Sequence, residues 1–391
     1  MTLSPPATPG SGGRAWVTLI TNPSYVAGLL ALHRTISSLS DYPLLVMTTP
    51  SLPESYQTFL KSYGFTLIPV SHLSPSTSQH AGFDPTMVRL NDAWTKLQVF
   101  GLVEYDKVIL IDADMIFLKD MDELFDLELP GRDWIGAAPA CVCNPLNLAH
   151  YPKDWQVQPA CLYTILTLLR VPENCSLSHQ QSPTPLLSPE IPSLDAPRTA
   201  HLLNSGLVVL YPSTTLLDSL VSFLETSPTV AQARFADQDV IAEAFKGRWR
   251  PLPWWCNALK TLRGAHKALW KDEQVANIHY ILDKPWAARP ASLPPHRPSS
   301  TMPSPDLPPS PVSVKSRHES PPSHAYLKSA LTRRRTLPPA LLEIVRNTPE
   351  QESLTDYGEV HKWWWVVYED VLEEMKTKGV EWEMVDRWVK R

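Results

Sequence analysis

The sequence predicts an α/β fold built on a doubly wound, mostly parallel sheet. Short runs of aliphatic residues, typical of strands, alternate along the chain with stretches whose apolar residues recur at helical spacing. The run at 107–111 ends in four large aliphatic residues, as expected for a strand that is buried on both faces. This alternation of strands and helices is the pattern of sheets with helices packed on both sides.

The elements follow one another in a regular order. Gly64 and Gly247 should end two of the helices, and Asn91 or Asp92 should cap a third. Residues 15–286 are therefore predicted to form one α/β domain. The predicted strands cover residues 15–21, 43–49, 65–70, 107–111 and 202–213, and the predicted helices cover residues 25–39, 54–64, 91–102, 215–225 and 237–247.

The two ends of the chain differ from this central part in composition. Residues 1–14 are expected to form a flexible leader. Eleven of the 40 prolines fall between positions 290 and 322, so residues 287–340 are predicted to be a Pro-rich, mostly disordered insertion. Residues 341–391 form a C-terminal helical segment, with a helix over 360–375, which we expect to pack back on the main domain.

Composition excludes several classes of protein. A net charge of −5 argues against a nucleic-acid partner. The longest nearly apolar stretch, 160–169, is about half a membrane span, and we expect a cytoplasmic protein without a transmembrane segment. The five cysteines are too few for a disulfide framework in a chain of 391 residues. Cys141 and Cys143 lack a second ligand pair at zinc-finger spacing and are interpreted as ordinary thiols.

Two aspartates, Asp112 and Asp114, follow the buried strand at 107–111. Carboxylates at the C-terminal end of such a strand lie where open α/β sheets bind ligands. Two acids one residue apart can share a hard cation, which offsets the cost of burying both charges. The alternative is a strand end with solvated acids, since the same spacing recurs at positions 120/122 and 237/239.

Several stretches, taken together and in order, resemble the glycogenin-like family-8 glycosyltransferases and their fungal branch of nucleotide-diphospho-sugar transferases. The resemblance runs from about residue 15 to residue 286 and implies a Rossmann-like fold of the GT-A type. The stretches that carry it are VTLITNPSY (17–25), WTKL (94–97), IDAD (111–114), NSG (204–206), ADQD (236–239) and HYILDKPW (279–286).

The resemblance also implies roles for individual residues. Those matched to the nucleotide and donor-sugar contacts are Leu19, Thr21, Asn22, Tyr25, Asp112, Ala113, Asp114, Asn204, Ser205, Gly206 and Lys284. Those matched to the metal site are Asp112, Asp114 and His279, and those matched to the reacting centre are Lys96, Asp237 and Gln238.

This sequence departs from the family pattern in two places. The closing motif usually has a glycine and five residues between its histidine and lysine, whereas here four residues separate His279 from Lys284, with Ile281 and Leu282 in the middle. About sixty residues, from Cys141 to Leu203, separate the metal strand from the NSG loop. We therefore expect an insertion around residues 156–200, with the stretch 156–171 as its core.

The implied reaction is the metal-dependent transfer of a hexose, with retention of anomeric configuration, from UDP-glucose or UDP-galactose to a separate small-molecule or glycan acceptor. Two oxygen ligands and one imidazole suit Mn²⁺ or another divalent cation. Asp237 would act as a transient nucleophile or stabilise positive charge at the anomeric carbon. A catalytically impaired nucleotide-sugar-binding or scaffold relative is the rival interpretation, and a homodimer is left open.

Simpler structural roles are the alternatives for these residues. Asp237 could cap a helix, Asn204 could cap a strand, Lys96 could lie on a solvated face, and His279 could be a core histidine. The tryptophans at 254–255 and 363–365 could stack on sugars, but core or interface packing is favoured for most of them.

Overall fold

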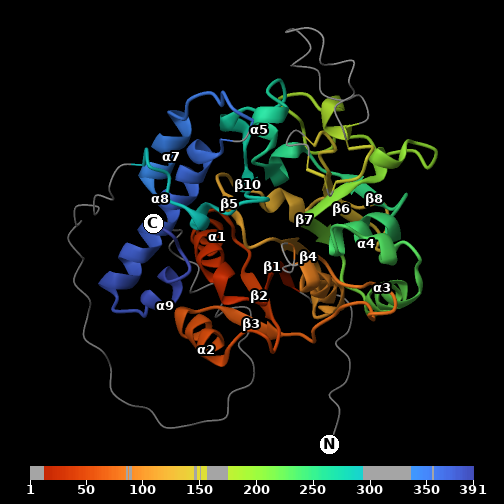
Figure 1. The fold of residues 1–391 in the computed structure, drawn as a ribbon, viewed down its shortest axis with the longest axis horizontal. Helices are drawn as coiled ribbons and strands as arrows, with labels where there is room; N and C mark the ends of the chain where they lie inside the picture. Colours follow the sequence, from red (N-terminus) through yellow and green to blue (C-terminus); the bar gives the residue numbers. More distant parts are fainter. Residues whose placement is uncertain are drawn as a thin grey trace, which may run out of the picture.

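A seven-stranded sheet lies at the centre of the molecule (Figure 1). The computed structural model describes residues 13–84, 87, 90–144, 148–149, 151–155, 175–293, 336–354 and 356–391. The spatial order of the strands is β3-β2-β1-β4-β7-β6-β8. Their bounds are Gly13–Ile20 for β1, Leu44–Thr48 for β2, Thr66–Pro69 for β3, Tyr105–Ile111 for β4, Ile135–Pro139 for β6, Leu203–Leu210 for β7 and Trp249–Pro251 for β8.

Most neighbours in this sheet run parallel. The pairs β1/β2, β1/β4, β2/β3 and β6/β8 are parallel, whereas β7 runs antiparallel to both β4 and β6. The predicted α/β fold with a mostly parallel sheet of the GT-A type is therefore confirmed. Because β1 and β4 are neighbours, the loops that follow their C-terminal ends open onto the same edge of the sheet, which is where α/β proteins bind ligands.

Each face of the sheet carries its own hydrophobic core. Alternate residues of a strand point to opposite faces, so Trp16 and Ile109 enter one core while Val17 and Val108 enter the other. The first core is covered by α1 (Val26–Leu39), α2 (Glu54–Tyr63) and α8 (Gly358–Thr377), and the second by the 3₁₀ helix η3 (Ala93–Gly101), α3 (Thr214–Thr226) and α4 (Asp237–Ala244).

A smaller three-stranded sheet brings the end of the domain to the centre. It consists of β5 (Met115–Phe117), β10 (Asn277–His279) and β9 (Ala258–Leu259), in the order β5-β10-β9. In the antiparallel register of β5 and β10, His279 pairs with Met115, and the amide of Tyr280 donates to the carbonyl of Asp114 at 2.9 Å. This pairing positions His279 beside the acid pair.

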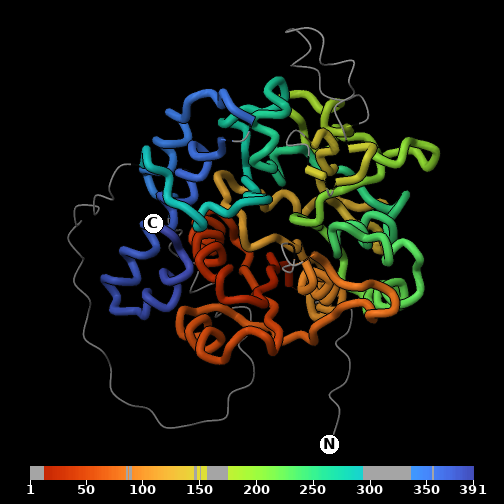
Figure 2. The backbone as a smooth tube through the Cα atoms, in the orientation of Figure 1, coloured from red at the N-terminus to blue at the C-terminus, as the bar shows by residue number. Residues whose placement is uncertain are grey.

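The C-terminal segment folds back against the first helix, as the tube in Figure 2 shows for the blue end of the chain beside the red helix α1. It contains α7 (Pro339–Arg346), α8 and α9 (Glu383–Asp386). The three consecutive tryptophans of α8 are fully buried in the core, as is Trp254. A sugar-stacking role is thereby excluded for these four side chains, because no face of their rings is exposed.

The tryptophans of α8 also hold the closing segment at 279–286. The indole of Trp365 donates to the carbonyl of Pro285 at 2.9 Å, and the hydroxyl of Tyr280 donates to the carbonyl of Val360 at 3.0 Å. The ring of Trp364 packs against that of Trp286 at 5.5 Å. The C-terminal helix therefore supports the segment that carries His279 and Lys284.

Some boundaries differ from those predicted. Strand β1 begins at Gly13, so residues 13 and 14 of the leader predicted for 1–14 belong to the strand, and residues 1–12 lie outside the described part of the chain. The helix predicted at 91–102 is a 3₁₀ helix, and neither proposed cap acts as one. Asn91 accepts a hydrogen bond from the amide of Phe83 instead, while Asp92 bonds to Thr21.

Of the other predicted features, some are confirmed, one is wrong and some lie outside the description. Gly64 has a φ of 106° and ends α2 in the left-handed conformation, as predicted. Gly247 has a φ of 74° but does not end α4, because that helix already stops at Ala244 with Phe245 as its C-cap. The insertion core at 156–171 and most of the Pro-rich stretch, 294–335, are outside the described residues.

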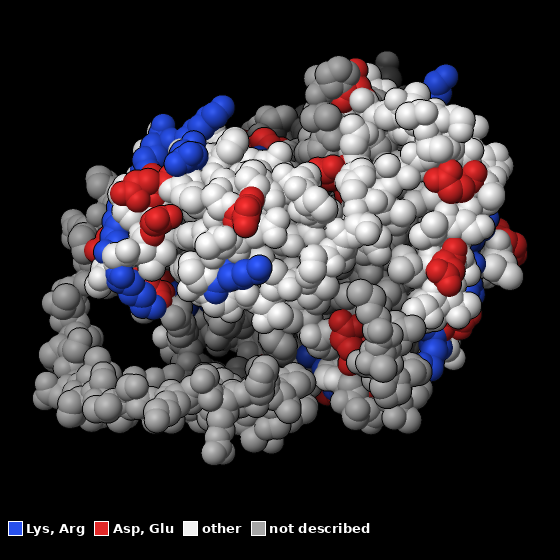
Figure 3. Space-filling view, turned by 90° about the horizontal axis from the view of Figure 1, so that it is seen from below, with Lys and Arg blue, Asp and Glu red and all other residues white. Residues whose placement is uncertain are grey.

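The distribution of surface charge and the composition of the helices bear on the kinds of partner that the chain can bind. On the face seen in Figure 3, acidic and basic side chains are interspersed over the described surface. None of the helices in the described part of the chain combines the length and apolar character needed to cross a bilayer.

Candidate active site

A pocket of about 830 Å³ lies at the C-terminal ends of β1 and β4. Its volume is in the range typical of small-molecule sites. The structure brings together in its lining every residue that the sequence singled out. These are Leu19, Thr21, Asn22, Tyr25, Lys96, Asp112, Ala113, Asp114, Asn204, Ser205, Gly206, Asp237, Gln238, His279 and Lys284.

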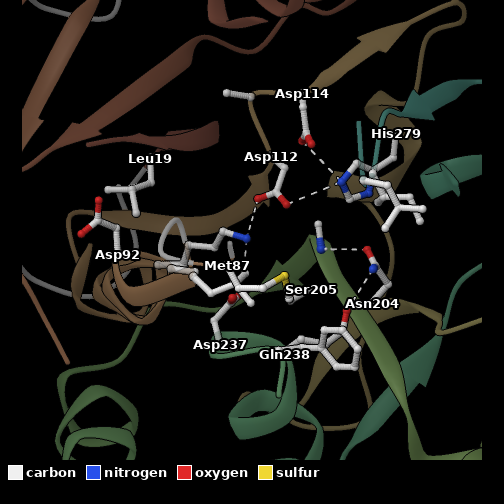
Figure 4. A pocket seen from close by; sticks show the side chains of 18 of the residues that line it. Leu19, Met87, Asp92, Asp112, Asp114, Asn204, Ser205, Asp237, Gln238 and His279 are labelled. Atoms are coloured by element: carbon white, nitrogen blue, oxygen red, sulfur yellow. Dashed lines mark hydrogen bonds and ion pairs between the residues drawn. The ribbon is translucent and has the colours of Figure 1, made fainter. Parts of the chain in front are cut away.

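The acid pair faces a histidine across this pocket (Figure 4). Nε2 of His279 lies 3.7 Å from a carboxylate oxygen of Asp112 and 3.4 Å from one of Asp114. Asp114 is only 4% exposed, so the alternative of a solvated strand end does not describe it. The pair at 120/122 instead has hydrogen-bond partners elsewhere, since Asp120 accepts from the amide of Asp122 at 2.8 Å and Asp122 accepts from the amide of Asp41 at 2.7 Å.

A chain of amide side chains fixes the orientation of His279. Its Nδ1 bonds to Oδ1 of Asn257 at 2.9 Å, and Nδ2 of Asn257 donates to Oδ1 of Asn204 at 2.7 Å. Nδ2 of Asn204 in turn donates to Oε1 of Gln238 at 2.9 Å. Because Oδ1 of Asn257 can only accept, Nδ1 of His279 carries a proton, and this bond turns Nε2 toward the two acids.

These three side chains fit a divalent cation. The ligand atoms of Asp112, Asp114 and His279 all lie within 4.8 Å of one another. Two carboxylates that face each other at this distance repel unless a positive charge stands between them. Two carboxylates and an imidazole whose other nitrogen is hydrogen-bonded are a common donor set for Mn²⁺ and similar ions.

Two lysines form ion pairs with the carboxylates of the site. Nζ of Lys96 lies 2.7 Å from Asp112 and 3.3 Å from Asp237, and Nζ of Lys284 contacts Asp114. Burial alone would lower the pKa of Lys96, but the two carboxylates outweigh burial and raise it. Burial would likewise raise the pKa of Asp114, but Lys284 and His279 hold it well below its usual range. Lys96 and Asp114 are therefore charged at neutral pH.

Asp237 does not cap the helix that it begins. Ala236 occupies the N-cap position of α4 without a side-chain bond, and Asp239 accepts from the amides of Arg234 and Phe235 at 2.6 and 3.0 Å. Asp237 itself is 3% exposed and faces Lys96. Burial and the neighbouring Asp112 raise the pKa of Asp237 to about 6, against the opposing effect of Lys96. This carboxylate is thus held in the pocket at an electrostatic cost, which is typical of functional groups.

Backbone positions around the histidine are tightly constrained. A Cβ on Gly206 would lie 2.4 Å from Cε1 of His279, so only glycine lets the NSG loop pass beneath the imidazole. The amide of Asp112 donates to the carbonyl of Gly206 at 2.9 Å. In the closing segment, Leu282 has a φ of 65°, so a leucine adopts here the left-handed conformation that favours glycine.

The end of the pocket next to β1 is polar and partly preorganised. The hydroxyl of Thr21 donates to Asp92 at 2.8 Å, and the carboxamide of Asn22 accepts from the amide of Ser24 at 2.9 Å. Tyr25 packs edge-on against Trp286 at 5.5 Å. These contacts keep the side chains after β1 in the pocket wall.

Two of these polar residues were missed by sequence reasoning. Asn257 holds His279, but it stands alone in WWCN, where no motif distinguishes it. Asp92 was considered only as a helix cap, although its position next to the lysine helix was a usable signal.

Comparison with known proteins decides the family. The family model described as glycosyl transferase family 8 matches residues 17–289, which is more than half of the chain. The chain belongs to this family. The predicted membership is confirmed, and with it the enzyme class, a hexosyltransferase that uses a nucleotide-sugar donor.

Galactinol synthases are among the curated relatives that the chain resembles. Galactinol synthase 4 of Arabidopsis thaliana is 29% identical over 290 residues, covering 73% of this chain and 77% of that protein. Galactinol synthase 1 of Solanum lycopersicum is 26% identical over 276 residues, covering 70% and 73%.

Two of the similar solved structures are also glycosyltransferases. LgtC, described in complex with donor and acceptor sugar analogs, has a TM-score of 0.42 at 14% identity and is covered to 89%, against 70% of this chain. GlyE of Streptococcus pneumoniae has a TM-score of 0.43 at 17% identity over 71% of this chain, which spans 56% of GlyE.

Proposed function

We propose that this family-8 enzyme transfers a hexose from UDP-galactose or UDP-glucose, with divalent metal and with retention of configuration, to a separate acceptor. The observation that carries the proposal is the convergence of Asp112, Asp114 and His279 on one point, with Lys284 and Asp237 beside it. Such a group of acids, imidazole and lysines suits a diphosphate leaving group next to a developing positive charge.

Each residue has a role that its surroundings support. Asp112, Asp114 and His279 would hold a divalent cation such as Mn²⁺, which would supply positive charge for the departing diphosphate. Lys284 leaves Asp114 to contact the same oxygens, because a phosphate offers it more negative charge than one carboxylate. Lys96 keeps Asp112 in place. The residues proposed to hold the nucleotide and the donor sugar are Leu19, Thr21, Asn22, Tyr25, Ala113, Asn204, Ser205 and Gly206.

Asp237 and Gln238 would lie at the reacting carbon. With a pKa of about 6, Asp237 is mostly ionised at neutral pH. It is then available either as a transient nucleophile or as a fixed negative charge that stabilises the oxocarbenium-like centre, and both routes stay open. The amide chain that ends at Gln238 links this position to His279, so donor binding and metal binding share one set of hydrogen bonds.

The acceptor side of the pocket has an aromatic wall. The half-buried rings of Tyr151 and Phe235 line the pocket, and the buried ring of Trp155 supports Phe235 by stacking on it at 5.3 Å. Aromatic faces pack well against the C–H face of a cyclic polyol or sugar. The name of the relatives, galactinol synthase, favours a small galactoside as product, so UDP-galactose and a cyclic polyol are the first pair to test.

The chain is not expected to glycosylate itself. Between Asp237 and His279 there is no tyrosine. Tyr280 is fully buried, and its hydroxyl bonds to the carbonyl of Val360. Incubation of the purified protein with Mn²⁺ and each UDP-hexose, followed by mass spectrometry of the intact chain, should show no added hexose. Successive hexose increments on a tyrosine would contradict a separate acceptor.

The proposed reaction has a direct test. UDP release is measured from UDP-galactose, UDP-glucose and related donors, with candidate polyols and sugars as acceptors and with Mn²⁺ or chelator. We expect metal-dependent release that increases when the correct acceptor is added. Measurable UDP binding without release from any donor would favour the rival, a nucleotide-sugar-binding relative without catalysis. Cytoplasmic location and a homodimer stay predictions.

A further inference from the structure

A second group of metal-binding side chains lies outside the acid site. Cys141, Cys143, Cys175 and His266 place one ligand atom each within 4.8 Å of all the others. The cysteines are not joined by disulfides. Cys143, Cys175 and His266 are at most 2% exposed, so three of the four ligand atoms are shielded from water.

The arrangement converges on one nitrogen. The sulfurs of Cys141, Cys143 and Cys175 lie 3.3, 3.2 and 3.9 Å from Nε2 of His266. An imidazole nitrogen makes one hydrogen bond, as donor or as acceptor, so hydrogen bonding cannot account for three sulfurs around it. In a tetrahedral zinc site, bond lengths of about 2.3 Å to sulfur and about 2.0 Å to nitrogen separate sulfur from nitrogen by about 3.6 Å. The observed distances bracket that value.

We propose that these four residues form a structural zinc site. Three cysteines and one histidine complete a tetrahedron without an open position, which is the pattern of structural and not catalytic zinc. Thiolate ligands select zinc over the harder ions suited to the acid site. The cysteines lose their thiol protons to solvent on binding, and the histidine binds through its unprotonated Nε2.

The site would join three separate segments of the chain. Cys141 and Cys143 follow β6, Cys175 precedes the 3₁₀ helix Ser176–His179, and His266 ends the short helix α5 (Leu262–Ala265). Cys141 also lines the donor pocket, in the same wall as Tyr151 and Trp155. Zinc would therefore tie the segment after β6 to the segments at Cys175 and His266, and hold the pocket wall that Cys141 shares with Tyr151 and Trp155.

The sequence alone did not reveal this site, and Cys141 and Cys143 were interpreted as ordinary thiols. Cys175 is well removed from the Cys-x-Cys pair, and His266 lies 91 residues after Cys175. A zinc-finger motif contains two pairs of ligands, and the members of each pair are close in sequence. Here only Cys141 and Cys143 form such a pair, and the fold brings Cys175 and His266 next to them.

The first test needs no mutation. The full chain is purified without added metal, dialysed against EDTA, and analysed for metal content by elemental analysis and native mass spectrometry. We expect one zinc per chain that survives dialysis and is released when the thiols are modified under denaturing conditions. Chain that binds cobalt in its place should show the thiolate charge-transfer bands of tetrahedral cobalt. Zinc-free folded protein, or a disulfide among these cysteines, would overturn the proposal.

Variants then locate the metal. Cys143→Ser and His266→Asn should lose the tightly bound zinc and melt at a lower temperature. Cys256→Ser is the matched control, because Cys256 is equally buried but lies outside the cluster. Asp114→Asn should retain zinc while losing transferase activity, so the test is independent of the proposed reaction. Zinc retained by both ligand variants, or lost from Asp114→Asn alone, would place the metal elsewhere and refute the cluster.

Discussion

At the scale of single residues, the site depends on charges that are balanced only when the right partners are present. Asp112 and Asp114 meet Lys96, Lys284 and His279 within hydrogen-bonding or ion-pair distance. The two lysines partly neutralise the acids and so keep the pocket assembled before a cation and a diphosphate enter. Removing one carboxylate therefore changes both the metal site and the balance around it.

Asp112→Asn and Asp114→Asn should each reduce metal-dependent turnover at least about a hundredfold, the scale of losing a main electrostatic contact. The fold should survive, because asparagine is nearly isosteric with aspartate. Turnover is measured across a Mn²⁺ titration, with the melting temperature as control. Full activity with unchanged metal dependence would mean that the acid pair is only the end of a strand.

A second residue-scale prediction concerns His361, a buried residue in the first turn of α8. Its Nε2 lies 2.9 Å from Nζ of Lys260, and its other ionisable neighbours are Asp283, Lys284, Asp356, Tyr280 and Tyr357. Burial and the charge of Lys260 lower the pKa of His361 to about 3. This imidazole is neutral in the folded chain and accepts the hydrogen bond from the lysine.

The sign of the pH dependence follows from this shift. Below pH of about 6.5 the unfolded chain binds a proton at His361 that the folded chain does not, so stability falls as pH falls, by at most about 1.4 kcal/mol per pH unit. His361→Gln keeps a neutral acceptor for Lys260 and should flatten this decline. Urea unfolding between pH 7 and pH 5 measures it. An identical pH slope in wild type and variant would be inconsistent with a buried neutral histidine.

At the scale of elements, the spacing of apolar residues predicts most of the long strands and helices. It does not predict which strands pair with one another. The helix at 25–39 and the strand at 107–111 have strong apolar patterns and form as α1 and β4 nearly where expected. Strand β6 was missed because its sequence, IGAAP, contains small residues and a proline with low strand propensity. Strand β10 has three residues and exists only because β5 and β9 pair with it.

A larger part of the candidate site than of the surrounding fold could be predicted from the sequence. The resemblance identified fifteen residues that the structure does bring into one pocket. It could not identify Asn257 or the Cys141–His266 contact, since these depend on how distant segments meet in space. Tertiary pairing of isolated polar residues leaves no periodic signal in a single sequence.

An element-scale prediction concerns the support that α8 gives to the closing segment. Trp365→Phe removes the hydrogen bond to the carbonyl of Pro285 and leaves that acceptor buried, at a cost of about 1–3 kcal/mol. Because Lys284 immediately precedes Pro285 in the chain, the loss of this support should raise the KM for the UDP-sugar. Trp363→Phe is the matched control, since its indole donates to Thr348 and not to the closing segment. Equal changes in KM for both variants would mean that α8 contributes stability alone.

At the scale of the whole molecule, two buried leucines flank the Pro-rich stretch. Leu293 and Leu337 are 5% and 7% exposed, so the described chain is anchored on each side of it. Replacing residues 296–333 by a flexible Gly/Ser linker of about a dozen residues should change the free energy of unfolding by less than about 1 kcal/mol, because closure entropy varies slowly with length. Thermal unfolding and UDP binding are the measurements, with a scrambled 296–333 sequence as control. A large loss of stability with either variant would indicate that the native stretch is packed.

The contact between α8 and the closing segment has a consequence for how the enzyme is made. Residues 13–111 contain β1 to β4 and can begin to pack as they leave the ribosome, whereas Pro285 meets Trp365 only after a further 80 residues have been synthesised. A nascent chain in which α8 has not yet left the ribosome would contain the acid pair. The segment that carries Lys284 would still lack its hydrogen bond from α8. The donor site is therefore complete only after α8 has been translated, and chains that lack α8 would bind nucleotide sugar weakly.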